Sequence, residues 1–221
     1  MNRAAEDGPK LFDWWPDWRG ECAAVVASGP SIKEVDLSVL RDRIHVLVIK
    51  TTVDRVPWAE VCYGCDAPWW IDRKGLPSFK GLKMYHGVNI TSYPWSKNMR
   101  RVKIEMSKDN LLVDEPLALG NGGNSGFQGL NLVTQFGATS IMLVGFDCKE
   151  HKGLLHWYGR NTAPGMNNPD RSNFNRWAPA FEIAKRDAEN LGVEIVNCSP
   201  ISSIKSFKKM SINETLEEWG L

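Results

Sequence analysis

The chain contains the stretch Gly120-Asn121-Gly122-Gly123-Asn124-Ser125-Gly126, which runs directly into a helical pattern ended by Gly137. The apolar positions of that helix are Phe127, Leu130, Leu132, Val133 and Phe136. A continuous apolar run over residues 140–144 then predicts a buried strand, closed by Gly145-Phe146-Asp147. Glycines let the backbone approach a ligand, and the start of a helix offers unpaired N–H groups to an anion. Residues 120–147 therefore predict half of a nucleotide or phosphate site.

The rest of the chain repeats the alternation of strand and helix. Short apolar runs predict further strands at 22–27, 44–49, 61–63, 82–85, 102–104 and 193–196. Further helices are expected to begin at Ser31 and near Trp69, and to cover 177–191, 202–210 and 212–219. Strands that alternate with helices favour a Rossmann-like, doubly wound α/β fold with a mostly parallel sheet. We expect one α/β domain over 22–210, an irregular segment over 1–21 and a C-terminal helix over 211–221.

Residues 148–176 hold few periodic apolar positions and many Gly, Asn, Pro and Arg residues. A loop this long in a compact domain predicts a lid or a site. It contains His156-Trp157-Tyr158-Gly159-Arg160, whose groups suit acid–base catalysis, stacking and neutralisation of phosphate charge. The alternative is an aromatic anchor, with Trp157 pinning the loop to the domain.

Polar residues follow several of the predicted strands, and ligands bind at the carboxyl ends of strands in such sheets. The first strand is followed by Ser28, Gly29, Pro30 and Ser31, the second by Lys50, the third by Asp66, and the strand at 140–144 by Asp147. Near the end of the chain Asn197-Cys198-Ser199 follows another strand. The ordinary alternative for the first group is a turn in which Ser31 and Glu34 form a capping box, and for Asn124-Ser125-Gly126 it is helix capping.

Composition narrows the function further. The net charge of +1 indicates neither a polyanionic partner nor binding to a membrane surface. No apolar run approaches the length of a membrane span. We see no signal peptide and expect a cytoplasmic protein whose five cysteines are reduced. Cys62 and Cys65 have the spacing of half a zinc knuckle, but no second pair exists, and we predict no metal and no cofactor.

Several of these motifs occur in an order that resembles the bacterial sialyltransferases of glycosyltransferase family 42. The motifs are Val25 to Ser31, Asn124-Ser125-Gly126, Gly145-Phe146-Asp147, His156-Trp157 and Val196 to Pro200. The chain resembles still more a related group of phage and prophage proteins. Flagellin glycosyltransferases associated with motility and a pterin pyrophosphokinase-like family share the same core pattern.

The resemblance implies a transferase that binds a nucleotide-activated sugar, of CMP type, without a metal. Gly29, Pro30, Ser31, Asn124, Ser125 and Gly126 would surround the nucleotide. For a transferase of this kind we expect Lys50 and Asp66 to line the base or sugar pocket, His156 to act as the acid or base, and Arg160 to stabilise the leaving phosphate. The chain departs from the family at Lys50, where an asparagine is usual, and at Arg160, where the family has its general-base histidine.

Two alternatives remain beside glycosyl transfer. One is metal-dependent pyrophosphate transfer, and the other is a non-catalytic phage protein that binds a nucleotide. A phage origin would place the protein in the host cytoplasm and would make DNA or a surface glycan the acceptor. The sequence also leaves a homo-oligomer open.

Overall fold

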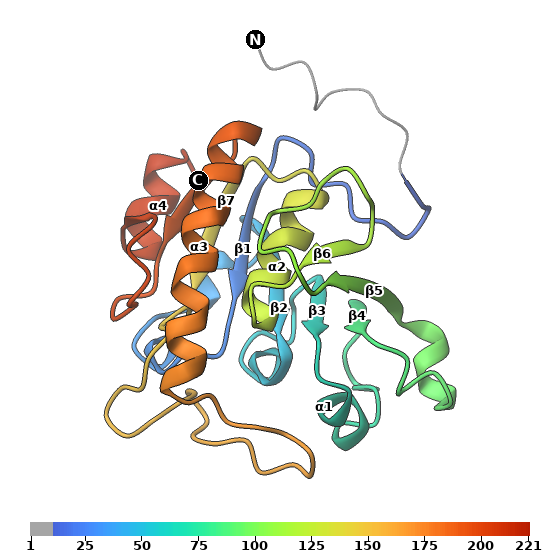
Figure 1. The fold of residues 1–221 in the computed structure, drawn as a ribbon. Helices are drawn as coiled ribbons and strands as arrows, with labels where there is room; N and C mark the ends of the chain where they lie inside the picture. The colour runs from blue at the N-terminus through green and yellow to red at the C-terminus, as the bar shows by residue number, and fades with distance from the viewer. Residues whose placement is uncertain (1–10) are drawn as a thin grey trace.

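The computed structural model describes residues 11–221, and in this range nine strands form one parallel sheet (Figure 1). The strands are β1 (Cys22–Val26), β2 (His45–Ile49), β3 (Val61–Gly64), β4 (Leu82–His86), β5 (Arg100–Glu105), β6 (Ala118–Gly120), β7 (Ser140–Val144), β8 (Glu194–Asn197) and β9 (Lys208–Lys209). All pairs of neighbouring strands are parallel. The predicted doubly wound α/β fold is confirmed, and its sheet is parallel throughout.

The strand order is β6-β5-β4-β3-β2-β1-β7-β8-β9. The direction in which the chain adds new strands to the sheet therefore reverses between β1 and β7. From β1 the chain adds β2 to β6 on one side and then crosses back to place β7 on the other side. Val26 accordingly pairs with Val48 of β2 and with Val144 of β7. A doubly wound sheet binds its ligands at such a switch point, outside the carboxyl ends of the strands.

Helices cover both faces of the sheet and make a three-layer molecule (Figure 1). α2 (Ser125–Gln135) and α3 (Arg171–Leu191) share one core with Val25 of β1. α1 (Ala67–Asp72) and α4 (Ile212–Glu218) share the other core with Val26. Four 3-10 helices complete the connections, namely η1 (Pro30–Lys33), η2 (Ser38–Leu40), η3 (Lys50–Asp54) and η4 (Pro94–Asn98). Because successive strand residues point to opposite faces and both faces are covered, the buried residues of β1, β2 and β7 are all apolar.

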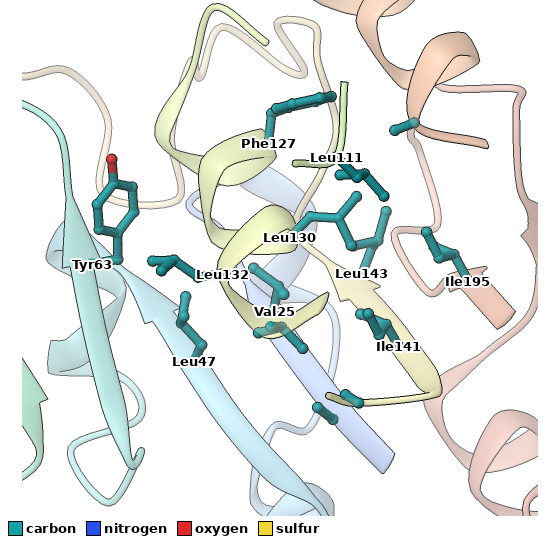
Figure 2. Packing of buried hydrophobic residues seen from close by; sticks show 14 of the residues in the cluster. Val25, Leu47, Tyr63, Leu111, Phe127, Leu130, Leu132, Ile141, Leu143 and Ile195 are labelled. Carbon is teal, nitrogen blue, oxygen red and sulfur yellow. The ribbon is translucent and has the colours of Figure 1, made fainter. Parts of the chain in front are cut away.

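α2 packs into the first core with several of its side chains, and Figure 2 shows Phe127, Leu130 and Leu132 among them. Its residues from Ser125 to Thr134 are all buried. Gly129 allows this close approach, because a Cβ there would lie 2.7 Å from Cδ1 of Ile49 on β2. Gly129 lies beyond the glycine-rich stretch 120–126, and it serves packing between helix and sheet.

Two predictions about helices need correction. Residues 202–210 were expected to be helical but hold β9, in which Lys208 and Lys209 pair with β8. The helix expected to begin at Trp177 begins at Arg171, because Asp170 and Asn173 form a capping box. Of the predicted irregular segment 1–21, residues 1–10 lie outside the described residues, and residues 11–21 contain no helix or strand, as expected. Within it Trp15 and Trp18 are buried and contact Phe136. No helix within residues 11–221 is long and apolar enough to cross a membrane.

Candidate functional site

A cleft of about 230 Å³ lies where the ends of β1 and β7 meet the start of α2. The loop between β7 and α3 closes it from outside, and Figure 1 shows this loop beyond the carboxyl ends of the strands. Nine of the residues predicted from sequence line the cleft: Ser28, Gly29, Lys50, Asp66, Asn124, Ser125, Gly126, Asp147 and His156. Residues separated by more than a hundred positions in the chain thus meet in one place, as the strand order requires.

Asp147 joins the ends of the two central strands. It is only 1% exposed, and its carboxylate accepts hydrogen bonds from the backbone N–H of Ser31 at 2.7 Å and from Ser31 Oγ at 2.5 Å. Burial raises the pKa of the Asp147 carboxyl, and the two bonds from Ser31 oppose that rise. Gly29 lies against the same carboxylate, since a Cβ there would be 2.6 Å from Asp147 Cγ. The joint has no room for a side chain at Gly29.

The capping box predicted for Ser31 and Glu34 is wrong. η1 begins after Gly29 without a side-chain cap, and the Ser31 hydroxyl is committed to Asp147 instead. Pro30 and Ser31 are both buried and do not line the cleft. They shape its floor through Asp147 and have no surface of their own to offer a ligand.

Lys50 is the cation at the strand ends of the cleft. It follows β2 in the left-handed backbone region, with φ of 48°, and its Nζ donates to Asp66 Oδ2 at 2.6 Å. Burial would lower the pKa of the Lys50 ammonium, but the charge of Asp66 and its hydrogen bond outweigh burial and raise it. Asp66 precedes α1 without capping it, so its carboxylate is free to turn to Lys50. Lys50 thus stays charged at neutral pH.

The start of α2 carries the predicted motif Asn124-Ser125-Gly126. Asn124 caps the helix by accepting a hydrogen bond from the N–H of Phe127 at 2.9 Å, so the capping alternative is correct for its side chain. The Ser125 hydroxyl lies between the N–H of Cys65 at 3.2 Å and the Cys65 Sγ at 3.0 Å, which fixes α2 to the end of β3. What α2 presents to the cleft is its first backbone turn, where N–H groups lack helical partners.

His156 is held in the cleft as a neutral base. Its Nδ1 lies 3.0 Å from Ser28 Oγ, and its ring stacks on Tyr158 at 5.0 Å. Burial and the charge of Lys50 lower the pKa of the His156 imidazole to about 4. Its Nε2 is buried and has no hydrogen-bond partner within the described residues. Since Nε2 is covered, it can exchange a proton with a ligand only after the residues around it move.

The loop over residues 148–170 is anchored to the end of β1. The backbone N–H of Trp157 donates to the Ser28 carbonyl at 3.0 Å, and the Arg55 guanidinium lies 5.5 Å from the centre of the Trp157 ring. This agrees with the alternative in which Trp157 pins the loop. The predicted general position of the lid is right, although it ends at Asp170 because α3 starts early.

Arg160 is not brought to the cleft. Its side chain is exposed and does not line the cavity, and Lys149 is the loop cation that does. Sequence reasoning also missed a group of uncharged lining residues, namely Asn161, Asn167, Asn168, Asn173, Phe174 and Trp177. Their only signal was the density of asparagine in the long loop.

The residues that follow β8, Asn197-Cys198-Ser199, bind the backbone at the end of β7. Ser199 Oγ accepts from the N–H of Phe146 at 2.8 Å, and Ser203 N–H donates to the Asp147 carbonyl at 2.9 Å. Asn197 and Ser199 are fully buried, so this motif positions the end of β7 and does not reach the cleft.

Within residues 11–221 no three His, Cys, Asp or Glu side chains are grouped so that they could hold a metal ion. The five cysteines are free thiols, and burial raises the pKa of Cys65 to about 11 and of Cys148 to about 12. No protein-family model matches the chain, and no curated protein sequence matches it.

Proposed function

We propose that the protein is a glycosyltransferase-like enzyme that uses a nucleotide-activated sugar, of CMP type, without a metal ion. One observation carries the proposal: a lysine cation, a helix start and a neutral imidazole with an unpaired nitrogen belong to residues of one cleft. The cleft lies at the switch point of a doubly wound sheet, the usual place for a nucleotide. The order of the motifs that resembles family 42 supports the same reading.

Lys50 and the first turn of α2 would hold the phosphate of the donor. Both favour an anion, the lysine by its charge and the helix start by its N–H groups and dipole. A phosphate that approaches Lys50 competes with Asp66 for the ammonium. Breaking the bond between sugar and phosphate leaves its electron pair on the phosphate, whose growing charge Lys50 would stabilise.

His156 would take the proton of the acceptor hydroxyl as its oxygen bonds to the anomeric carbon of the sugar. A base with a pKa near 4 is weak, but one of the two causes of that low value is the charge of Lys50. A bound phosphate beside Lys50 offsets this charge and raises the pKa of His156 toward the range where a general base is effective. Donor binding would thus prepare the base for the reaction.

Nucleotide binding is the first test. Thermal denaturation with CMP, UMP, GMP and AMP should show one clear stabiliser, because a ligand of the native state alone raises stability by mass action. Lys50→Ala should remove most of that stabilisation, whereas Lys33→Ala, at an exposed position outside the cleft, should keep it. If no nucleotide stabilises the protein, the proposal fails.

Donor cleavage is the second test. Hydrolysis of CMP-activated sialic acid in the presence of EDTA should be lost in His156→Ala and retained in His45→Ala, whose imidazole contacts Glu60 away from the cleft. Nucleotide binding without any donor cleavage would favour the non-catalytic alternative.

Lys149 favours pyrophosphate transfer as a second candidate. It lines the cleft and forms no hydrogen bond or ion pair within the described residues, so it could hold a further phosphate of a longer chain. That chemistry requires a magnesium-bound triphosphate. A strict need for magnesium, with a pyrophosphorylated product, would decide for this candidate and against glycosyl transfer.

A further inference from the structure

One part of the cleft wall carries no charged side chain. It is the part built by residues 161–177, which belong to the end of the lid loop and the first two turns of α3. Its members, apart from Pro169, are Asn161, Asn167, Asn168, Asn173, Phe174 and Trp177. A polyanion such as DNA is held by cations along its backbone, and the lining residues of this wall include none, since Arg171 and Arg176 of the same segment do not line the cleft and Arg176 pairs with Asp109. Amides and aromatic rings instead suit an uncharged ligand with both apolar and hydrogen-bonding groups.

Phe174 and Trp177 form a fixed aromatic corner. Trp177 Nε1 donates to the Gly123 carbonyl at 2.9 Å, which ties the indole to the glycine-rich loop. Phe174 packs against it with ring centroids 5.4 Å apart and an angle of 81° between the rings. Both rings are only half-buried although they line the cleft. Rings that are held in place but left partly uncovered are preorganised to receive a ligand.

The amides beside this corner divide into two roles. Asn168 Oδ1 accepts from the Asn161 N–H at 2.7 Å, and Asn168 Nδ2 donates to the Asn161 carbonyl at 3.0 Å, so this pair fixes the shape of the loop. Asn167 accepts from Asn161 Nδ2 with its backbone carbonyl alone. Its side-chain amide makes no hydrogen bond to any residue that the structure describes. One acceptor and two donors are therefore available in the cleft wall.

We propose that this corner is a subsite for a neutral sugar ring, with its apolar face on Phe174 and Trp177 and its hydroxyl groups on the Asn167 amide. Because it rests on the proposed glycosyl transfer, the sugar bound here is that of the acceptor, which makes the acceptor a glycan and not DNA. The phosphate of the donor belongs at Lys50, on the strand ends. A nucleobase fits the corner less well, since two rings at 81° give a flat ligand only one stacking face.

The test uses saturation-transfer NMR with methyl glycosides of galactose, glucose, mannose and N-acetylglucosamine, each measured with and without CMP. At least one glycoside should bind, and Phe174→Ala should weaken it by about tenfold, a loss of the size expected for a buried aromatic contact. Asn167→Ala should weaken the same glycoside and cannot disturb the fold through lost internal bonds of its side chain. Tyr93→Ala and Asn190→Ala are the matched controls outside the cleft and should leave the affinity unchanged.

Three results would overturn the subsite. The first is that no glycoside binds. The second is that Phe174→Ala weakens the binding of CMP and not of the glycoside, which would assign the corner to a nucleobase. The third is that an oligothymidine strand binds the wild type and that both variants lose this binding. The binding of CMP tests the proposed function separately. Glycoside binding that both variants weaken, without any bound nucleotide, would keep the subsite and reject the transferase, whereas nucleotide binding without a glycoside would do the reverse.

Discussion

The backbone after β1 passes very close to the end of β7 at Gly29. The Gly29 N–H donates to the Gly145 carbonyl at 2.9 Å, and a Cβ at Gly29 would lie 2.5 Å from that oxygen. The φ of Gly29 is −59°, an angle that any residue adopts, so glycine is needed here for space alone. The two strand ends can meet Asp147 only because this position has no side chain.

Gly29→Ala should therefore act through steric overlap. We expect a loss of about 1–3 kcal/mol in the free energy of unfolding, as for other overpacked sites, together with a large loss of nucleotide affinity. Urea denaturation and CMP titration measure the two effects. The control is Gly153→Ala, which meets nothing within 4 Å and is strained only by its φ of 76°. A Gly29→Ala protein that keeps its CMP affinity would show that the joint can widen without disturbing the cleft.

His156 makes stability depend on pH. Its folded pKa of about 4 lies below the ordinary 6.5, so the unfolded chain binds the proton more readily. As pH falls from about 6.5 to about 4, the native state should lose up to about 3 kcal/mol through this residue. His156→Gln should lose correspondingly less over the same range, whereas His45→Gln should follow the wild type. Equal pH slopes for wild type and His156→Gln in chemical denaturation would contradict the burial of a neutral imidazole.

At the residue scale, sequence identified most of the cleft but assigned some side chains to the wrong partners. The order of polar residues at strand ends was enough to find Lys50, Asp66 and His156, because parallel strands end at the same edge. It could not find the bond from Ser31 to Asp147, since the competing partner Glu34 is near in sequence and Asp147 is not. Nor could it place Arg160, because a side chain in a long loop can face the cleft or the solvent.

At the scale of elements, α2 supports a segment that has little regular structure. Asn131 Oδ1 accepts from the N–H groups of Leu112 and Gly120, and its Nδ2 donates to the Leu112 carbonyl at 2.7 Å. Gln135 binds the Leu112 and Ala118 carbonyls in the same manner. Two amides on one helix thus pair backbone groups of β6 and of Leu112, which precedes it, that have no partner in the sheet.

Asn131→Ala should be costly because it leaves buried backbone groups unpaired. We expect a loss of about 2–4 kcal/mol in the free energy of unfolding and faster amide exchange between residues 110 and 120. The matched change is Asn190→Ala, at an exposed position on α3, which should alter stability by less than about 0.5 kcal/mol. If both variants are equally stable, water replaces the Asn131 amide without loss.

Elements with local signals were predictable and those with distant partners were not. Asn124 begins α2 and Gly192 ends α3 in the left-handed region, as expected from capping preferences. The start of α3 also carried a local signal, because Asp170 and Asn173 form a capping box, but with asparagine in place of the usual Glu or Gln. Residues 202–210 lacked any such signal, since only pairing with β8 makes Lys208 and Lys209 a strand.

At the scale of the molecule, the C-terminal helix is part of the second core. Ile212 and Leu216 of α4 are buried there, and Thr215 Oγ1 lies 3.2 Å from Cys198 Sγ after β8. Removing residues 211–221 should therefore cost about 3–5 kcal/mol, from two buried aliphatic side chains and the surface they cover. Removing Gly220 and Leu221 alone should cost far less, because Leu221 is 41% exposed. Urea midpoints of the two truncated proteins test this, and similar midpoints would show that α4 contributes little.

The position of β1 between β2 and β7 also has a consequence for the order of synthesis. β2 leaves the ribosome soon after β1. Ser140 of β7, the partner of Cys22, follows only after β2 to β6 and α2 have been made. Until then one edge of β1 is open, and the turn at Ser31 lacks Asp147. The nascent chain thus exposes an apolar strand edge of the kind that chaperones protect and that mispairs with other chains. The cleft cannot be complete until the chain has been synthesised as far as Trp177.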